Sequence, residues 1–151
     1  MVDHRAERAI PVIPTNQTPE QLRRWFNSSL PQTLQIANIL LYLDAFFLLI
    51  NILGGRRGLG GITLILLAAS VAAYVLGGLG LANEEKRGYP VAVVAAFSPF
   101  VLRAYLSFQV GVLELGFILG FKQPLSLLFE VALIGLLLHT QSKSYVKTWF
   151  H

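Results

Sequence analysis

Three ionisable residues lie inside long apolar runs, where charged side chains are rare. Asp44 follows "LLYL", Arg103 lies within "PFVLRAYLSF", and Glu130 lies within "LSLLFEVALI". A charge at the centre of a bilayer costs at least about 2.5 kcal/mol, so such side chains find partners in the interior of a bundle. A guanidinium binds one carboxylate through two parallel hydrogen bonds and can share a second. The sequence therefore predicts a buried charge cluster of Asp44, Arg103 and Glu130.

Two carboxylates against one guanidinium leave one negative charge uncompensated. Either one acid is protonated, which makes the cluster a structural ion pair, or a cation or exchangeable proton joins it, which makes it a coupling site. The sequence has no cysteine, and we find no zinc-ligand pair, strained serine motif or Walker-type glycine loop. We therefore assign no catalytic residue, no metal ion and no cofactor.

The residues around these charges predict an integral membrane protein. Hydrophobic residues make up 54% of the 151 residues and charged residues 13%, whereas soluble domains have about 25% charged residues. The net charge of +4 comes from basic residues at the edges of apolar runs. Such positions are typical of topology signals. We therefore expect the lipid bilayer, and no nucleic acid, as a partner.

Four apolar runs predict an all-α bundle of four transmembrane helices within residues 34–141. The runs cover residues 34–53, 61–81, 90–108 and 124–139. About 20 residues cross the hydrocarbon core, so the last run is short. Residues 109–121 are apolar but contain three glycines and Glu114. A helix continuous with the third run would be about 48 Å long, so we expect an interfacial or re-entrant segment at the outer face.

The distribution of Lys and Arg predicts the orientation of the bundle. With both termini inside, eight of these residues lie in inner connections and three in outer ones. A fifth crossing would give seven against four, and cytoplasmic loops are normally the more basic. We therefore expect four crossings in the bacterial cell (inner) membrane, with both termini cytoplasmic.

Both ends of the chain place cations beside aromatic residues. Residues 1–33 are expected to be cytoplasmic, with an amphipathic interfacial helix over about 18–28; a helix packed on the loops is the alternative. Residues 142–151 form a basic-aromatic cytoplasmic tail. The predicted interfacial anchors are Arg23, Arg24, Trp25, Phe26, Lys147, Trp149 and Phe150. We expect them to bind anionic headgroups, with a specific partner as the alternative.

Small and polar residues predict which faces of the helices pack. Ala92, Ala96, Pro99 and Arg103 share one face of the third run, which we expect to face the interior, with a kink at Pro99. Asn51 comes seven residues after Asp44 and therefore lies on the same face as the acid.

The second run carries small residues at four-residue spacing. They are Ala69, Ala73 and Gly77, and such a ridge permits close helix approach. The ridge favours packing within the chain; self-association is the alternative.

The inner turn before the third run and the tail after the fourth carry a further pattern. Its residues are Lys86, Arg87, Gly88 and Tyr89 in the turn, and Ser142, Tyr145, Lys147, Trp149 and Phe150 in the tail. From about residue 34 onward the sequence resembles a group of uncharacterised, small four-helix bacterial integral membrane proteins that are common in actinobacteria. The resemblance implies fold and location only.

These features lead to three expectations about function. The first is a non-enzymatic accessory or structural subunit of a homo-oligomer or a larger membrane complex. The second is a small oligomeric transporter or channel that uses the charge cluster to couple to protons or cations. The third is a lipid-binding or lipid-modifying protein, with Glu114 near the outer interface.

Overall fold

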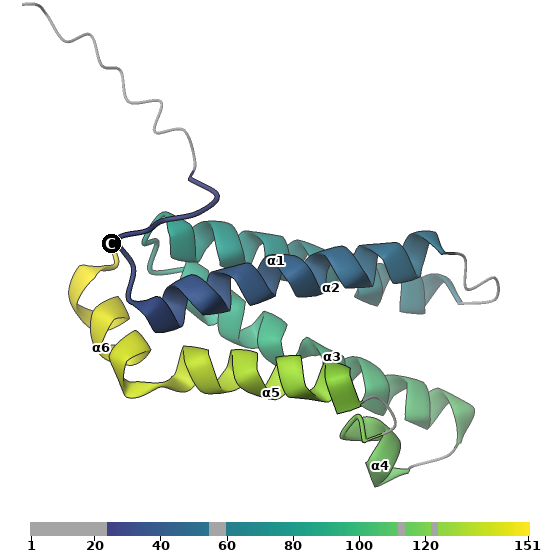
Figure 1. The fold of residues 1–151 in the computed structure, drawn as a ribbon. Helices are drawn as coiled ribbons and strands as arrows, with labels where there is room; N and C mark the ends of the chain where they lie inside the picture. The colour runs from purple at the N-terminus through teal and green to yellow at the C-terminus, as the bar shows by residue number, and fades with distance from the viewer. Residues whose placement is uncertain (1–23, 55–59, 112–113, 122–123) are drawn as a thin grey trace, which may run out of the picture.

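The described part of the chain is mostly helical. A computed structural model describes residues 24–54, 60–111, 114–121 and 124–151 (Figure 1). Its helices are α1 (Gln32–Leu53), α2 (Gly61–Ala82), α3 (Gly88–Val110), α4 (Leu115–Ile118), α5 (Pro124–Leu138) and α6 (Thr140–Trp149). The predicted all-α fold is confirmed, and the four predicted spans correspond to α1, α2, α3 and α5.

Three of these helices, α1, α2 and α3, are long and apolar enough to cross a membrane. The 15 residues of α5 extend only about 22 Å at 1.5 Å per residue. The helix α5 reaches spanning length together with α6, from which it is bent by 50°. The first two residues of the predicted outer-face segment belong to the end of α3. Part of the remaining segment forms α4, a helix of 4 residues.

The four long helices lie as two antiparallel pairs, α1 with α2 and α3 with α5, and the pairs are joined most extensively by the packing of α2 on α3. Figure 1 shows the pairs converging at the end of the bundle where both ends of the described chain lie, and separating toward the end that carries α4. We call these the terminal end and the α4 end. Large apolar side chains pack at the terminal end, where Leu34, Leu41, Leu81, Leu133 and Leu137 are all fully buried.

Glycines on α2 allow the helices to approach closely near the terminal end. A Cβ atom at Gly77 would lie 2.7 Å from the Cα atom of Ala92 on α3, and one at Gly80 would overlap the backbone of Gly88. Because lipid gives helices no hydrophobic reason to associate, such close backbone packing stabilises the bundle. Of the ridge predicted on α2, Gly77 therefore packs within the chain.

The other two members of that ridge are less involved in packing. Ala73 is partly buried against the core, and Ala69 is exposed. Toward α1, the close contact lies at Gly78, where a Cβ atom would meet the ring of Tyr42 at 2.7 Å. The actual contact surface of α2 is thus shifted toward its C-terminal glycines.

The two terminal segments differ from their predicted form. Residues 24–30 form bends and turns, so the last residues of the segment predicted as a helix, about 18–28, are not helical. The rest of that segment lies within residues 1–23, which are outside the described part. The side chain of Asn27 accepts hydrogen bonds from both the backbone N–H and the hydroxyl of Ser29, and such a local turn competes with a helix. The predicted tail contains α6, which begins where His139 Nδ1 accepts the N–H of Gln141 at 3.2 Å.

Candidate functional site

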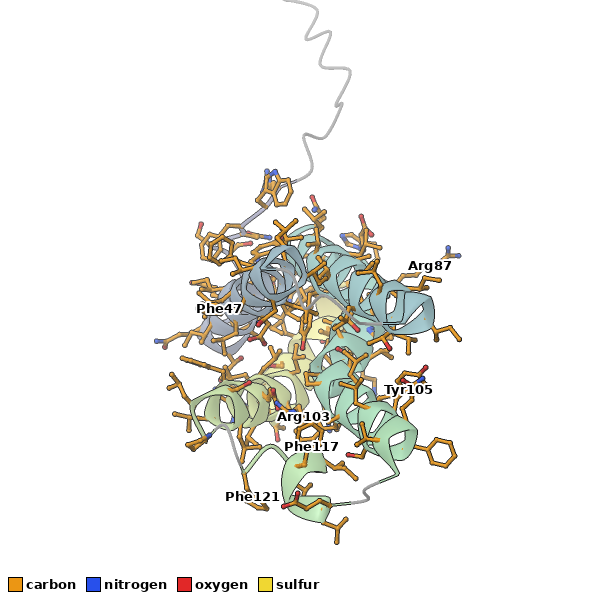
Figure 2. All side chains as sticks on the ribbon, turned by 90° about the vertical axis from the view of Figure 1, so that its right-hand side faces the viewer. Phe47, Arg87, Arg103, Tyr105, Phe117 and Phe121 are labelled. Atoms are coloured by element: carbon orange, nitrogen blue, oxygen red, sulfur yellow. The ribbon has the colours of Figure 1, made fainter. Side chains whose placement is uncertain are left out.

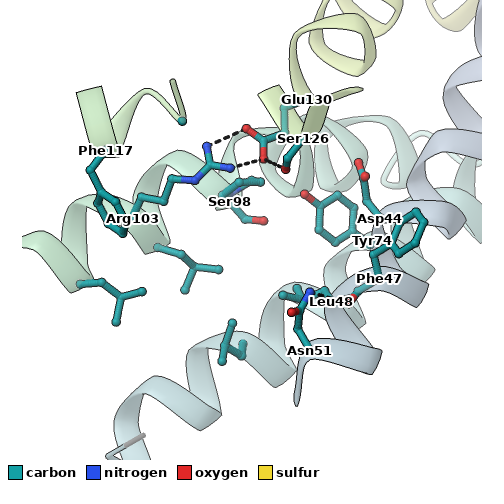
Figure 3. Close-up of a pocket in the computed structure, with 15 residues that line it drawn as sticks. Asp44, Phe47, Leu48, Asn51, Tyr74, Ser98, Arg103, Phe117, Ser126 and Glu130 are labelled. Atoms are coloured by element: carbon teal, nitrogen blue, oxygen red, sulfur yellow. Dashed lines mark hydrogen bonds and ion pairs between the residues drawn. The ribbon is translucent and has the colours of Figure 1, made fainter. Parts of the chain in front are cut away.

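Arg103 on α3 and Glu130 on α5 form a buried ion pair across the bundle (Figure 3). Nη1 donates to Oε2 at 2.8 Å and Nη2 donates to Oε1 at 2.5 Å. The two side chains are only 14% and 5% exposed. Two parallel, charge-assisted hydrogen bonds are among the strongest side-chain contacts. The structure thus brings together two of the three residues of the predicted charge cluster.

Three neighbours position this pair, and sequence reasoning did not single them out. Ser126, one helical turn before Glu130, donates its hydroxyl to Oε1 at 2.9 Å. The ring centroid of Phe100 lies 5.7 Å from the guanidinium carbon of Arg103, a distance that allows a cation–π contact. Gly120 packs on the guanidinium, where a Cβ atom would come within 2.6 Å of Nη1. The spacings of four and three residues were the only signals for Ser126 and Phe100.

Asp44 on α1 is near the pair but is not bonded to it. Arg103 forms its ion pair with Glu130, and no ion pair joins it to the carboxylate of Asp44. The Oδ2 atom of Asp44 is buried and has no hydrogen-bond partner among the described residues. The predicted three-membered cluster is therefore an ion pair and a separate carboxylate.

These side chains line a cavity of about 290 Å³ between the two helix pairs. The polar wall residues are Asp44, Asn51, Ser98, Arg103, Ser126 and Glu130, and the aromatic ones are Phe47, Tyr74 and Phe117. They come from the last part of α1 and α3 and the first part of α2 and α5, so the cavity lies toward the α4 end. Figure 2, viewed from that end, shows Arg103 between α3 and α5 and Phe117 beside it.

The faces expected to point inward meet the core and this cavity. Ala92 and Ala96 on α3 are buried, and Pro99 continues the same face along the cavity wall. Pro99 lies inside α3, and the helix continues past it to Val110. Asn51 lies on the wall with Asp44, and its amide donates to the carbonyl of Phe47 at 2.9 Å. Glu114 directly precedes α4 and is not part of the wall.

The charges of the cavity favour a cation. Its wall carries two carboxylates and one guanidinium, and the guanidinium is already paired. A buried carboxylate without a hydrogen-bond partner is unfavourable, and a bound cation or a proton on Asp44 would remove that penalty. Within the described ranges, no three His, Asp or Glu side chains are grouped to hold a metal ion.

The predicted membrane anchors lie at the terminal end, away from the cavity. Trp25, Phe26 and Trp149 are 63%, 47% and 57% exposed, and Lys147 and Arg24 are exposed as well. Arg23 lies outside the described residues. Phe150 differs from its prediction, because it is 3% exposed and packs in the core with its ring against that of Tyr145.

Hydrogen bonds fasten three distant segments together at the terminal end. The backbone of Arg24 exchanges two hydrogen bonds with the side chain of Asn83, at 2.9 and 3.1 Å. The backbone N–H of Lys86 donates to the carbonyl of His151, and the N–H of His151 donates to the carbonyl of Glu84. The α2–α3 turn thus holds both ends of the described chain.

Comparison of the chain with protein-family models, with curated proteins and with solved structures finds no match.

Proposed function

We propose that the protein binds a cation in the cavity, with Asp44 as the counter-ion, and carries it across the membrane as a small transporter. The separate carboxylate of Asp44 is the observation that carries this proposal. Arg103 and Glu130 satisfy each other without a ligand, whereas Oδ2 of Asp44 has no partner within the described chain. A monovalent cation or a proton would supply the missing positive charge.

The distribution of packing supports access to the cavity from one side. Buried leucines and close glycine contacts fill the terminal end of the bundle. The cavity lies toward the α4 end, where the helix pairs separate. A site that is closed on one side and reachable from the other corresponds to one state of a carrier that works by alternating access.

We further propose that the terminal end faces the cytoplasm of a bacterial cell (inner) membrane, so that the cavity faces outward. The excess of Lys and Arg in the inner connections, eight against three, supports this orientation. The hydrogen bonds that hold residues 24 and 151 to the same turn support an even number of crossings, by α1, α2, α3 and α5.

Transport by purified protein in liposomes tests the proposal. Uptake of Na⁺, K⁺ and protons is measured for the unchanged protein, for Asp44→Asn, and for Glu85→Gln as a matched control. Glu85 is exposed in the α2–α3 turn, so its amide should transport normally. We expect flux above that of empty liposomes, and a loss of about tenfold or more in Asp44→Asn, because the amide cannot neutralise a cation. Absence of flux for every cation, with the protein correctly inserted, would contradict the proposal.

An accessory or structural subunit of a homo-oligomer or larger complex is the second candidate. The saturated Arg103–Glu130 pair favours it, because two bonded side chains with little exposure suit static packing. Purification in mild detergent, with identification of all co-migrating proteins, tests this role. A stoichiometric partner, together with lower recovery of that complex for Asp44→Asn, would support the subunit over the transporter.

A further inference from the structure

The cavity has two chemically different sides (Figure 3). On one side Arg103 and Glu130 neutralise each other and Ser126 adds a third hydrogen bond. On the other side Asp44 and Tyr74 extend from α1 and α2 toward the cavity. The carboxylate of Asp44 therefore lies beside an aromatic ring and near the neutralised pair, without being bonded to that pair.

We propose that this cavity takes a small organic ammonium ion, with its nitrogen at Asp44 and its alkyl part against the apolar wall. The inference rests on the proposed function and adds the class of substrate. A carboxylate beside an aromatic face is the combination that recognises alkylated ammonium ions, because both attract the positive charge. The leucine side chains of Leu48, Leu67, Leu102 and Leu106 complete the wall and give an alkyl chain an apolar surface.

A second polar atom on the wall fits an ammonium donor. The hydroxyl oxygen of Ser98 is buried on the same wall as Asp44 and lies beside the hydroxyl of Tyr74. Buried polar atoms are normally paired. An ammonium group donates several hydrogen bonds and so can serve both the carboxylate and the hydroxyl, each of which can accept.

Donor chemistry and size separate an ammonium ion from a bare metal ion. Hard metal cations take about six or more oxygen ligands, whereas the described residues include no group of three acidic or histidine side chains placed around one point. The cavity volume of about 290 Å³ is at the lower end for small-molecule sites. An amine with a short alkyl chain matches both the few donors and the limited space.

Calorimetric titration of the full chain in detergent with n-butylammonium, and with Na⁺ for comparison, tests the inference. We expect saturable binding of n-butylammonium, about tenfold or more weaker binding by Asp44→Asn, and unchanged binding by Glu85→Gln. Leu67→Phe narrows the cavity without changing its charge and should also weaken binding about tenfold. Leu64→Phe is its matched control, because Leu64 is on the same helix and 48% exposed.

The possible results separate this inference from the proposed function. Binding that is lost in Asp44→Asn or in Leu67→Phe, and kept in both controls, supports an organic cation. Liposomes that show Asp44-dependent flux of protons or Na⁺, together with no saturable n-butylammonium binding at millimolar concentrations, overturn the inference and leave the proposed function standing. Equal binding by the unchanged protein, Asp44→Asn and Leu67→Phe overturns the inference as well, because the ligand then lies elsewhere.

Discussion

The guanidinium of Arg103 lies directly on the backbone of Gly120. A Cβ atom at this glycine would come within 2.6 Å of Nη1 and 3.1 Å of Cζ. Gly120 also has a φ of +82°, a left-handed conformation that side chains disfavour. Glycine is therefore required at this position for two reasons, and the segment after α4 is part of the wall that holds the ion pair.

Replacing Gly120 by alanine should destabilise the protein. The added methyl group meets the guanidinium and the left-handed backbone, so we expect a loss of about 1 to 3 kcal/mol, measured by unfolding in detergent. Gly116→Ala is the matched control, because its Cβ atom would meet only Glu114 Oε1, at 3.9 Å. A similar stability of both variants would show that the segment after α4 does not hold Arg103.

Removing one partner of the buried ion pair should cost more than removing both. Glu130→Leu leaves Arg103 uncompensated, and we expect a loss of about 3 to 5 kcal/mol, whereas Arg103→Met combined with Glu130→Leu should recover much of it. Thermal unfolding of the two single variants and the double variant forms a complete cycle. Additive losses in that cycle would mean that the two side chains do not stabilise each other.

A methyl group between α2 and α3 should separate these helices. Gly77→Ala places its Cβ atom 2.7 Å from the backbone of Ala92, and neither backbone can move without disturbing the buried contacts of the terminal end. We expect a loss of about 1 to 3 kcal/mol and a lower yield of folded protein in size-exclusion chromatography. Gly135→Ala on α5 is the control, with nothing within 4 Å of its Cβ atom. Its yield should match that of the unchanged protein.

The hydroxyl of Tyr145 should stabilise the terminal end. It donates to Oε1 of Glu84 at 2.9 Å, so Tyr145→Phe leaves that carboxylate with one donor fewer, and we expect a loss of about 1 to 2 kcal/mol. Tyr105→Phe serves as the comparison, because the Tyr105 hydroxyl bonds only at an exposed site, to Gln109. Denaturant unfolding that shows no difference between the two variants would rule out a stabilising role for the Glu84 contact.

Single cysteines can test the proposed orientation, because the sequence has none of its own. Leu115 in α4 and Ser144 in α6 are both exposed and lie near opposite ends of the bundle. On intact cells, a maleimide that cannot cross the membrane should label Leu115→Cys and leave Ser144→Cys unlabelled until the cells are opened. The reverse labelling pattern would place the cavity on the cytoplasmic side.

Length and hydropathy of the apolar runs were sufficient to predict the helical bundle. A membrane-spanning helix must satisfy its own backbone, so runs of about 20 apolar residues have few alternatives, and α1, α2 and α3 follow the runs to within two residues at each end. Small residues every three or four positions also indicated the inner face of α3, because helical periodicity fixes which residues share a face.

The partner of Arg103 could not be predicted in the same way. The sequence does not distinguish Asp44 from Glu130 as the ion-pair partner of Arg103. The partner is decided by the rotation of α1 and α5 about their axes. Gly120 was not identified, and Phe150 was predicted as an interfacial anchor and not as a core residue, because their roles come from contacts between distant segments. The glycine packs on a side chain of α3, and Phe150 lies in a core built from α1, α2, α3 and α5.

The two hydrogen bonds between Arg103 and Glu130 tie α3 to α5 beside the cavity. Bonds of 2.8 and 2.5 Å tolerate little stretching, unlike contacts between aliphatic side chains, which slide and repack. The width of the cavity on this side is therefore fixed by a hydrogen-bonded ion pair. If the cavity takes an organic cation as we propose, longer alkyl chains must be accommodated on the opposite, leucine-lined side of the wall, because the ion pair cannot move apart.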